Sequence, residues 1–179
     1  LRTSLAVKCV LLTIFWLLVM ATLSPEKFSG SPISISKEFP QQKMREIILQ
    51  MLYALDMAPS AEDSLVPLLM SQTAVSQKHV LVALNQTKSI LEKSQELDLI
   101  IGNALKNKSF DSLDLVEKNV LRLTLFEHFY SPPINKAILI AEAIRLVKKF
   151  SYSEACPFIQ AILNDIFTDS SLNENSLSI

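Results

Sequence analysis

Glycine and cysteine are scarce in this chain, which has two of each among its 179 residues. Gly30 and Gly102 stand too far apart for a glycine-rich phosphate loop, and so few glycines argue against a β fold with many tight turns. Cys9 and Cys156 are also far apart in the sequence, and neither belongs to a CxxC pair. We therefore expect neither a disulfide framework nor a zinc site.

Motifs for catalysis and metal binding are also missing. His79 and His128 stand apart from any HExxH motif or cysteine pair, so we expect both to pack at helix surfaces. No carboxylate pair or nucleophile triad can be recognised in the sequence. These absences predict a protein that is no enzyme and that uses no metal, cofactor or small-molecule substrate.

Charge is nearly balanced along the chain. Lys and Arg number 17, Asp and Glu number 18, and the formal net charge is −1. The chain therefore lacks the overall basic charge that is typical of nucleic-acid-binding domains. Any binding of nucleic acid must depend on a local basic patch.

Residues 1–23 form an apolar segment. Its core, CVLLTIFWLLVMATL, carries no charge and follows Arg2 and Lys8, as in a secretory signal peptide. The core is shorter than the roughly 20 residues that cross a bilayer as a helix, and no A-x-A cleavage site follows it. We expect an extension upstream of the true start, with translation beginning near Met20. A signal or membrane anchor is the alternative.

Beyond a flexible leader at 24–41, apolar residues recur at helical spacing, which predicts an all-α fold of about seven packed helices. A polar tail is expected at 168–179. The predicted helices cover about 42–55, a short or kinked stretch from Ser60 through Pro67, 74–93, 97–105, 111–129 with Asp111 or Ser112 as its cap, 135–150 and 154–167.

Apolar spacing predicts a buried face for most of these helices. The helix at 74–93 should bury Val75, Leu81, Leu84, Ile90 and Leu91. The helix at 135–150 should bury Ala137, Ile140, Ala141, Ile144 and Val147, which would turn Arg145, Lys148 and Lys149 outward as a basic patch.

Three segments resemble the NusB family of bacterial transcription antitermination factors. They are REIILQMLY at 45–53, LVEKNVLRL at 115–123 followed by Phe126-Glu127, and AEAIRLVKKF at 141–150 followed by FIQAILN at 158–164. The resemblance covers about 42–167. It implies two packed three-helix bundles, at 42–109 and 110–167.

The resemblance also implies a function. A member of this family is expected to bind boxA RNA of ribosomal RNA operons together with NusE, a small-subunit ribosomal protein. It would join other Nus factors on the RNA polymerase elongation complex in the cytoplasm and help the polymerase read through terminators. We expect no membrane attachment.

Single-stranded RNA is bound by cations on phosphates, aromatic rings on bases and polar groups on base edges. The expected RNA-binding residues are Lys43, Arg45, Arg145, Lys148, Lys149, Phe150, Tyr152, Phe158 and Gln160. The expected partner-binding residues are Tyr53, Glu117, Lys118 and Arg122. Other roles stay open: a solvated face for Lys148 and Lys149, core packing for Phe158, half-buried packing for Tyr53, and an internal ion pair of Arg122 with a nearby Glu.

The chain departs from the family pattern in two places. The opening helix usually carries a run of arginines, but here the stretch at 41–45 reads QQKMR. The family motif FxNGxLD appears as FIQAILN, so that Gln160 has a longer side chain and Ala161 replaces a glycine. We therefore expect weaker RNA binding than in a typical member and more dependence on the protein partner.

Two other functions remain as alternatives. The same fold occurs as the N-terminal RNA-binding domain of a ribosomal RNA cytosine-5 methyltransferase, although the cofactor-binding domain of such an enzyme is not recognisable in this sequence. The apolar segment at 1–23 would instead suit a membrane-anchored helical adaptor.

Overall fold

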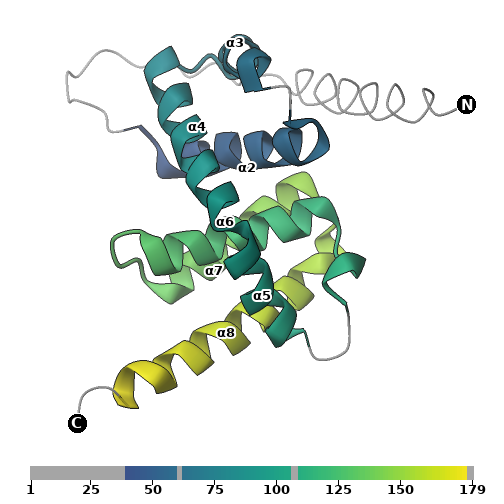
Figure 1. Ribbon diagram of the computed structural model, residues 1–179, viewed down its shortest axis with the longest axis vertical. Helices are drawn as coiled ribbons and strands as arrows, with labels where there is room; N and C mark the ends of the chain where they lie inside the picture. Colours follow the sequence, from purple (N-terminus) through teal and green to yellow (C-terminus); the bar gives the residue numbers. More distant parts are fainter. Residues whose placement is uncertain (1–38, 60–61, 106–108, 177–179) are drawn as a thin grey trace, which may run out of the picture. The chain divides into compact units, whose positions relative to one another are not determined.

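The computed structural model describes residues 39–59, 62–105 and 109–176, apart from the side chains of residues 62, 63 and 169–176. These residues form seven α-helices and two short 3-10 helices, and no strand (Figure 1). The predicted all-α fold is therefore confirmed. The helices are α2 (Gln41–Met57), α3 (Glu62–Thr73), α4 (Gln77–Glu92), α5 (Ser94–Ala104), η2 (Phe110–Ser112), α6 (Leu115–Tyr130), α7 (Lys136–Phe150), η3 (Ser153–Ala155) and α8 (Cys156–Ser176).

The predictions about the apolar segment at 1–23, and about the leader up to residue 38, fall outside the described residues. Within the described ranges, no helix combines the length and the apolar character that crossing a membrane requires.

The first group of helices consists of α2, α3 and α4, and α4 crosses α2 (Figure 1). The core of this group is aliphatic: Ile48 and Leu52 of α2 and Val80 and Ile90 of α4 are fully buried. Burial of such side chains stabilises the fold by about 1.5–3 kcal/mol each. Because helices of this length are marginal alone, this packing holds them in place.

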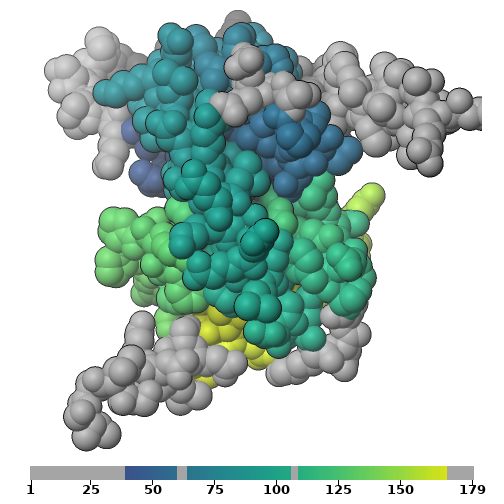
Figure 2. Space-filling view, viewed as in Figure 1, coloured from purple at the N-terminus to yellow at the C-terminus, as the bar shows by residue number. Residues whose placement is uncertain are grey.

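The second group has α6 near its centre, in contact with α5, α7 and α8. Val120, Leu121 and Leu125 of α6 are fully buried there. The sequence assigned α5 to the first bundle, but its two fully buried residues, Leu97 and Ile101, belong to a helix that packs mainly on α6 and α8. In Figure 2, α4 and α5 form one continuous strip across both groups.

The start of α6 differs from the prediction. Residues 110–112 form the 3-10 helix η2, so that neither Asp111 nor Ser112 can cap α6. Instead Asp114 is the N-cap and forms a capping box with Glu117, whose carboxylate accepts a hydrogen bond from the Asp114 backbone N–H at 3.3 Å. The predicted start of α7 is confirmed, because Asn135 caps it by accepting from the Ala137 backbone N–H at 2.8 Å.

Other helix ends also differ. Ala74 has a φ of 52°, in the left-handed region, so it separates α3 from α4 instead of beginning the helix predicted at 74–93. Pro67 lies inside α3, and the helix continues past it to Thr73. At the other end of the chain, α8 runs beyond the predicted end at 167 to Ser176.

The predicted buried faces of α4 and α7 are partly wrong. Leu81 is exposed, whereas Val80 and Ala83 are fully buried. In α7 the predicted residues Ala137 and Ala141 are exposed and Ile140 and Ile144 are half-buried. The buried residues of α7 are Leu139, Ala143, Leu146, Val147 and Phe150. Leu84 and Ile90 of α4 are buried as predicted, whereas the buried face of α7 is turned by about one position, or roughly 100°. Apolar residues cover more than one stripe of these helices, and tertiary packing selects among them.

Candidate nucleic-acid interface

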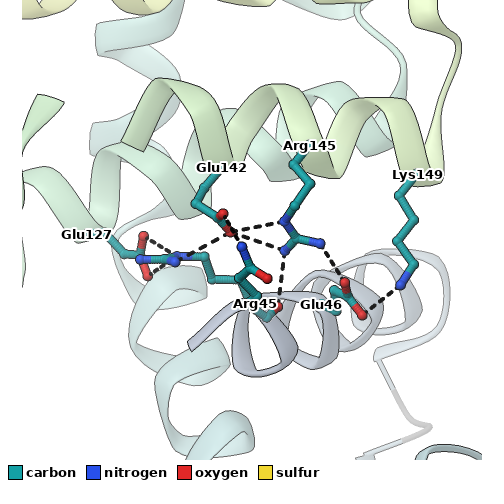
Figure 3. Close-up of polar contacts among 7 residues, drawn as sticks. Arg45, Glu46, Glu127, Glu142, Arg145 and Lys149 are labelled. Carbon is teal, nitrogen blue, oxygen red and sulfur yellow. Dashed lines mark hydrogen bonds and ion pairs between the residues drawn. The ribbon is translucent and has the colours of Figure 1, made fainter. Parts of the chain in front are cut away.

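A seam of ion pairs, here called the charge seam, joins α2 to α6 and α7 (Figure 3). Its members are Arg45 and Glu46 of α2, Glu127 of α6, and Glu142, Arg145 and Lys149 of α7. The three residues of α7 follow one another at spacings of three and four positions, so they lie on one face of the helix. That face points toward α2.

The inner end of the charge seam is the pair of Arg45 and Glu127. Arg45 Nε lies 2.9 Å from each carboxylate oxygen of Glu127, and both side chains are only 8% exposed. Arg45 Nη1 also lies 3.5 Å from Glu142 Oε2. Since a buried charge is stable only when it is paired, Arg45 and Glu127 depend on each other.

The outer end centres on Glu46, whose side chain is 10% exposed. Arg145 Nη1 donates to Glu46 Oε1 at 2.6 Å, and Lys149 Nζ donates to Glu46 Oε2 at 2.8 Å. Arg145 also donates to Glu142 Oε2 at 3.1 Å and to the Gln42 carbonyl oxygen at 3.2 Å. One carboxylate of α2 thus holds two cations of α7.

Burial raises the pKa of both glutamates, but their cationic partners offset it to different extents. For Glu46, burial is the largest single influence and raises the pKa, but the hydrogen bonds and charges of Lys149 and Arg145 together bring it below its ordinary value. For Glu127, burial dominates and raises the pKa despite the opposing charge of Arg45. The two carboxylates therefore respond to pH in opposite ways.

Glu46→Gln and Glu127→Gln are expected to change the pH dependence of stability in opposite directions. Glu46 stabilises the fold fully above its ordinary pKa of 4.5, and this contribution is lost as pH falls through the lower folded-state pKa. Glu127 is protonated more readily in the folded state, so its contribution to stability increases as pH falls through its raised pKa. Denaturant unfolding of both variants and the wild type from about pH 3 to pH 8 tests this. If the free energy of unfolding changed with pH in the same way in both variants, the expectation would be wrong.

A second polar cluster joins the end of α2 to α5 and α6. Arg122 Nε and Nη2 donate to the two carboxylate oxygens of Asp98 at 2.7 Å each, and Nη1 donates to Asp56 Oδ2 at 3.0 Å. The amide of Asn119, which is fully buried, donates to the same Asp56 oxygen at 2.9 Å. The hydrogen bonds to Asp98 are the main cause of a raised pKa at Arg122, so the guanidinium stays charged.

The expected RNA-binding residues fall into two sets. Arg45, Arg145 and Lys149 are brought together within the charge seam, opposite three carboxylates. Of the outward patch that the sequence predicted, Lys148 and Lys149 are exposed and Arg145 is half-buried, but Arg145 and Lys149 both pair with Glu46. The remaining residues lie outside the seam. Lys148, Tyr152 and Gln160 are exposed, Lys43 and Phe158 are half-buried, and Phe150 is buried beneath Lys149, whose Nζ lies 5.6 Å from the ring centroid.

The expected partner-binding residues lie along α2 and α6. Tyr53, Glu117 and Lys118 are half-buried. Glu117 takes part in the capping box, and Lys118 Nζ lies 5.0 Å from the ring centroid of Phe110. Arg122 forms the internal ion pairs that the sequence left as an alternative, although its partners are aspartates.

Sequence reasoning missed the carboxylates that neutralise the expected cations. Their signal was present in the spacing of Glu142, Arg145 and Lys149, but the partner Glu46 is about a hundred positions away in the sequence. It also missed a stacked pair of rings, Phe39 and His79, whose centroids are 4.3 Å apart. In the described part of the chain, no group of three or more histidine, cysteine and acidic residues could hold a metal ion.

The amino-acid sequence matches the profile of the NusB family over residues 42–167. It is also similar to a curated relative, the transcription antitermination protein NusB of Chlamydia muridarum. The two sequences are 44% identical over 153 residues, which are 84% of this chain and 93% of the relative. A relative from Geobacter sulfurreducens with the same name is 33% identical over 68% of this chain and 89% of its own length.

Solved structures share the fold. NusB of T. maritima superposes with a TM-score of 0.61 at 24% identity, over 73% of this chain and 92% of that one. A chain from the crystal structure of a plectonemic RNA supercoil gives a TM-score of 0.64 at 23% identity, over 73% of this chain and 95% of that one. At these identities the likeness concerns the fold alone.

Proposed function

Since this chain belongs to the NusB family, whose members are antitermination factors and no enzymes, we propose that it binds boxA RNA of ribosomal RNA operons together with NusE. In this proposal it joins the RNA polymerase elongation complex with other Nus factors in the cytoplasm and helps the polymerase read through terminators. The observation that carries the proposal is the family match, which spans α2 to α7 and most of α8.

The proposed RNA surface has the chemistry that single-stranded RNA requires. Lys43 and Lys148 offer ammonium groups to phosphates, and no carboxylate of the described residues forms an ion pair with either. Tyr152, which is 72% exposed, offers a ring to a base, and Gln160 offers an exposed amide to a base edge. The RNA supercoil structure, which contains a chain of the same fold, also supports a link between this fold and RNA.

The proposed NusE surface lies along α2 and α6, around Tyr53, Glu117, Lys118 and Arg122. Tyr53 and Lys118 are half-buried, so each keeps an accessible part for a partner. Arg122 would act through Asp56 and Asp98, because its guanidinium is already engaged with both carboxylates. This surface and the RNA surface use different residues, which would allow both partners to bind together.

The test is a binding titration with boxA RNA at several salt concentrations, with and without NusE. Lys43→Ala and Lys148→Ala are each expected to weaken RNA binding roughly three- to tenfold without changing sequence preference. Each should also lower the slope of log affinity against log salt by about 0.7, the value for one phosphate contact on single-stranded RNA.

Lys93→Ala is the control. Lys93 is an exposed lysine between α4 and α5 that pairs with Glu96 at 3.3 Å, and it is not one of the proposed RNA-binding residues. It should leave RNA affinity nearly unchanged. If Lys93→Ala and Lys148→Ala weakened binding equally, the effect would come from net charge and the proposed surface would be wrong. If the wild type bound boxA RNA no better than a scrambled sequence, with or without NusE, the proposed function itself would be wrong.

A further inference from the structure

We propose that Glu46 limits RNA affinity by competing with RNA phosphates for Arg145 and Lys149. The inference rests on the proposed function, since it concerns the same RNA surface. It assigns a role to a carboxylate of α2 to which the sequence and the family resemblance gave none.

Exposure places the three side chains in two layers. Glu46 is 10% exposed, whereas Arg145 is 28% exposed and Lys149 is 44% exposed. The cations therefore form an accessible rim over a nearly buried carboxylate, and in Figure 3 both extend from α7 toward Glu46. A phosphate can reach the rim, but it must approach cations that already have an anionic partner.

Three of the five N–H donors of Arg145 are already engaged. Its Nε donates to Glu142, its Nη1 donates to Glu46, and its Nη2 donates to the Gln42 carbonyl oxygen. A guanidinium has five N–H donors in a fixed plane, so these three bonds leave two donors for a phosphate, and the positive charge behind them is already paired with Glu46 and Glu142. Lys149 keeps N–H groups for a phosphate, but its charge is already balanced by Glu46 at 2.8 Å.

Electrostatics sets the size of the effect. A phosphate oxygen bonded to the free side of Lys149 Nζ would lie roughly 5–6 Å from the Glu46 carboxylate, given ordinary hydrogen-bond lengths. Repulsion between two unit charges at that distance, in surroundings close to water, weakens binding about three- to tenfold. Lys148, the neighbour of Lys149 in the sequence, is exposed and forms no ion pair with the described carboxylates, so it carries no such penalty.

The experiment compares Glu46→Gln with the wild type in titrations against boxA RNA. Glutamine keeps the shape of glutamate and can still accept hydrogen bonds, but it has no charge. We expect Glu46→Gln to bind about three- to tenfold more tightly, and its salt slope should steepen by about 0.7 for each additional phosphate contact. Circular dichroism and thermal unfolding establish that the variant is folded.

Two further variants separate competition from net charge. Glu92→Gln makes the same change in net charge at an exposed residue near the end of α4, and it should leave affinity nearly unchanged. Lys149→Met should weaken RNA binding less than about twofold in the wild type. In the Glu46→Gln background it should remove most of the gain in RNA affinity.

The outcomes are distinct. Equal RNA binding by folded Glu46→Gln would overturn the inference, because Glu46 would then not compete with phosphates. Weaker binding would overturn it too, because it would mean that Glu46 orients the cations for RNA. An equal gain in Glu92→Gln, or a gain that survives Lys149→Met, would overturn it as well. If the wild type binds boxA RNA specifically but Glu46→Gln gains nothing, only this inference fails. If the wild type does not bind boxA RNA at all, the proposed function fails with it.

Discussion

Replacing Glu127 with alanine is expected to lower the free energy of unfolding by about 3–5 kcal/mol, the cost of breaking a buried ion pair from one side. The reason is that Arg45 would keep its charge in a site where its side chain is 8% exposed. Its remaining carboxylate partner, Glu142, lies 3.5 Å away and already binds Arg145. Denaturant unfolding at neutral pH measures the loss.

The double variant Arg45→Met with Glu127→Leu is the control. It replaces both charges with apolar side chains of similar volume, and such replacements are often neutral or stabilising. We therefore expect it to be at least about 2 kcal/mol more stable than Glu127→Ala. If the single and the double variant were equally destabilised, the loss would come from packing and the ion pair would not explain it.

Replacing Arg122 with alanine is expected to cost about 2–4 kcal/mol, because it leaves two partly buried aspartates without their cation. Asp98 would lose two hydrogen bonds of 2.7 Å, and Asp56 would keep only the amide of Asn119. The three helices that these residues connect, α2, α5 and α6, would lose their common link. Thermal unfolding and denaturant unfolding both measure this change.

Arg122→Lys distinguishes charge from geometry. Lysine keeps the positive charge but cannot donate to both oxygens of Asp98 and to Asp56 from one planar group. We expect the free energy of unfolding of Arg122→Lys to lie between those of Arg122→Ala and the wild type. A fully stable Arg122→Lys would show that charge alone is needed. A fully stable Arg122→Ala that no longer binds NusE would instead assign Arg122 to the partner surface.

The helical fold was predictable because its signals are local. Apolar spacing marked most of the helices, and Asn135 lies where a helix start was expected. The errors arise where local signals were ambiguous. Leu81 and Ala141 belong to helices with more apolar positions than one stripe can use, and only the packing partner decides which positions are buried.

The candidate site was less predictable, for a different reason. Arg45, Arg145 and Lys149 were all expected to bind RNA, but Glu46, Glu127 and Glu142 neutralise their charge. Those glutamates look like ordinary members of solvated helices in the sequence. Only the three-dimensional arrangement places them against the cations, and this changes an apparent basic patch into a neutral seam.

The contacts of the charge seam also set an order of events during synthesis. They join residues 82 to 103 positions apart, from Arg45 with Glu127 to Glu46 with Lys149. At the usual rates of translation, α7 follows α2 out of the ribosome after about 5–20 s. Until then Arg45 and Glu46 have no partner on α7, and α2 lacks the helix that covers its charged side. The charge seam, which joins α2 to α6 and α7, can therefore form only when most of the chain has been made.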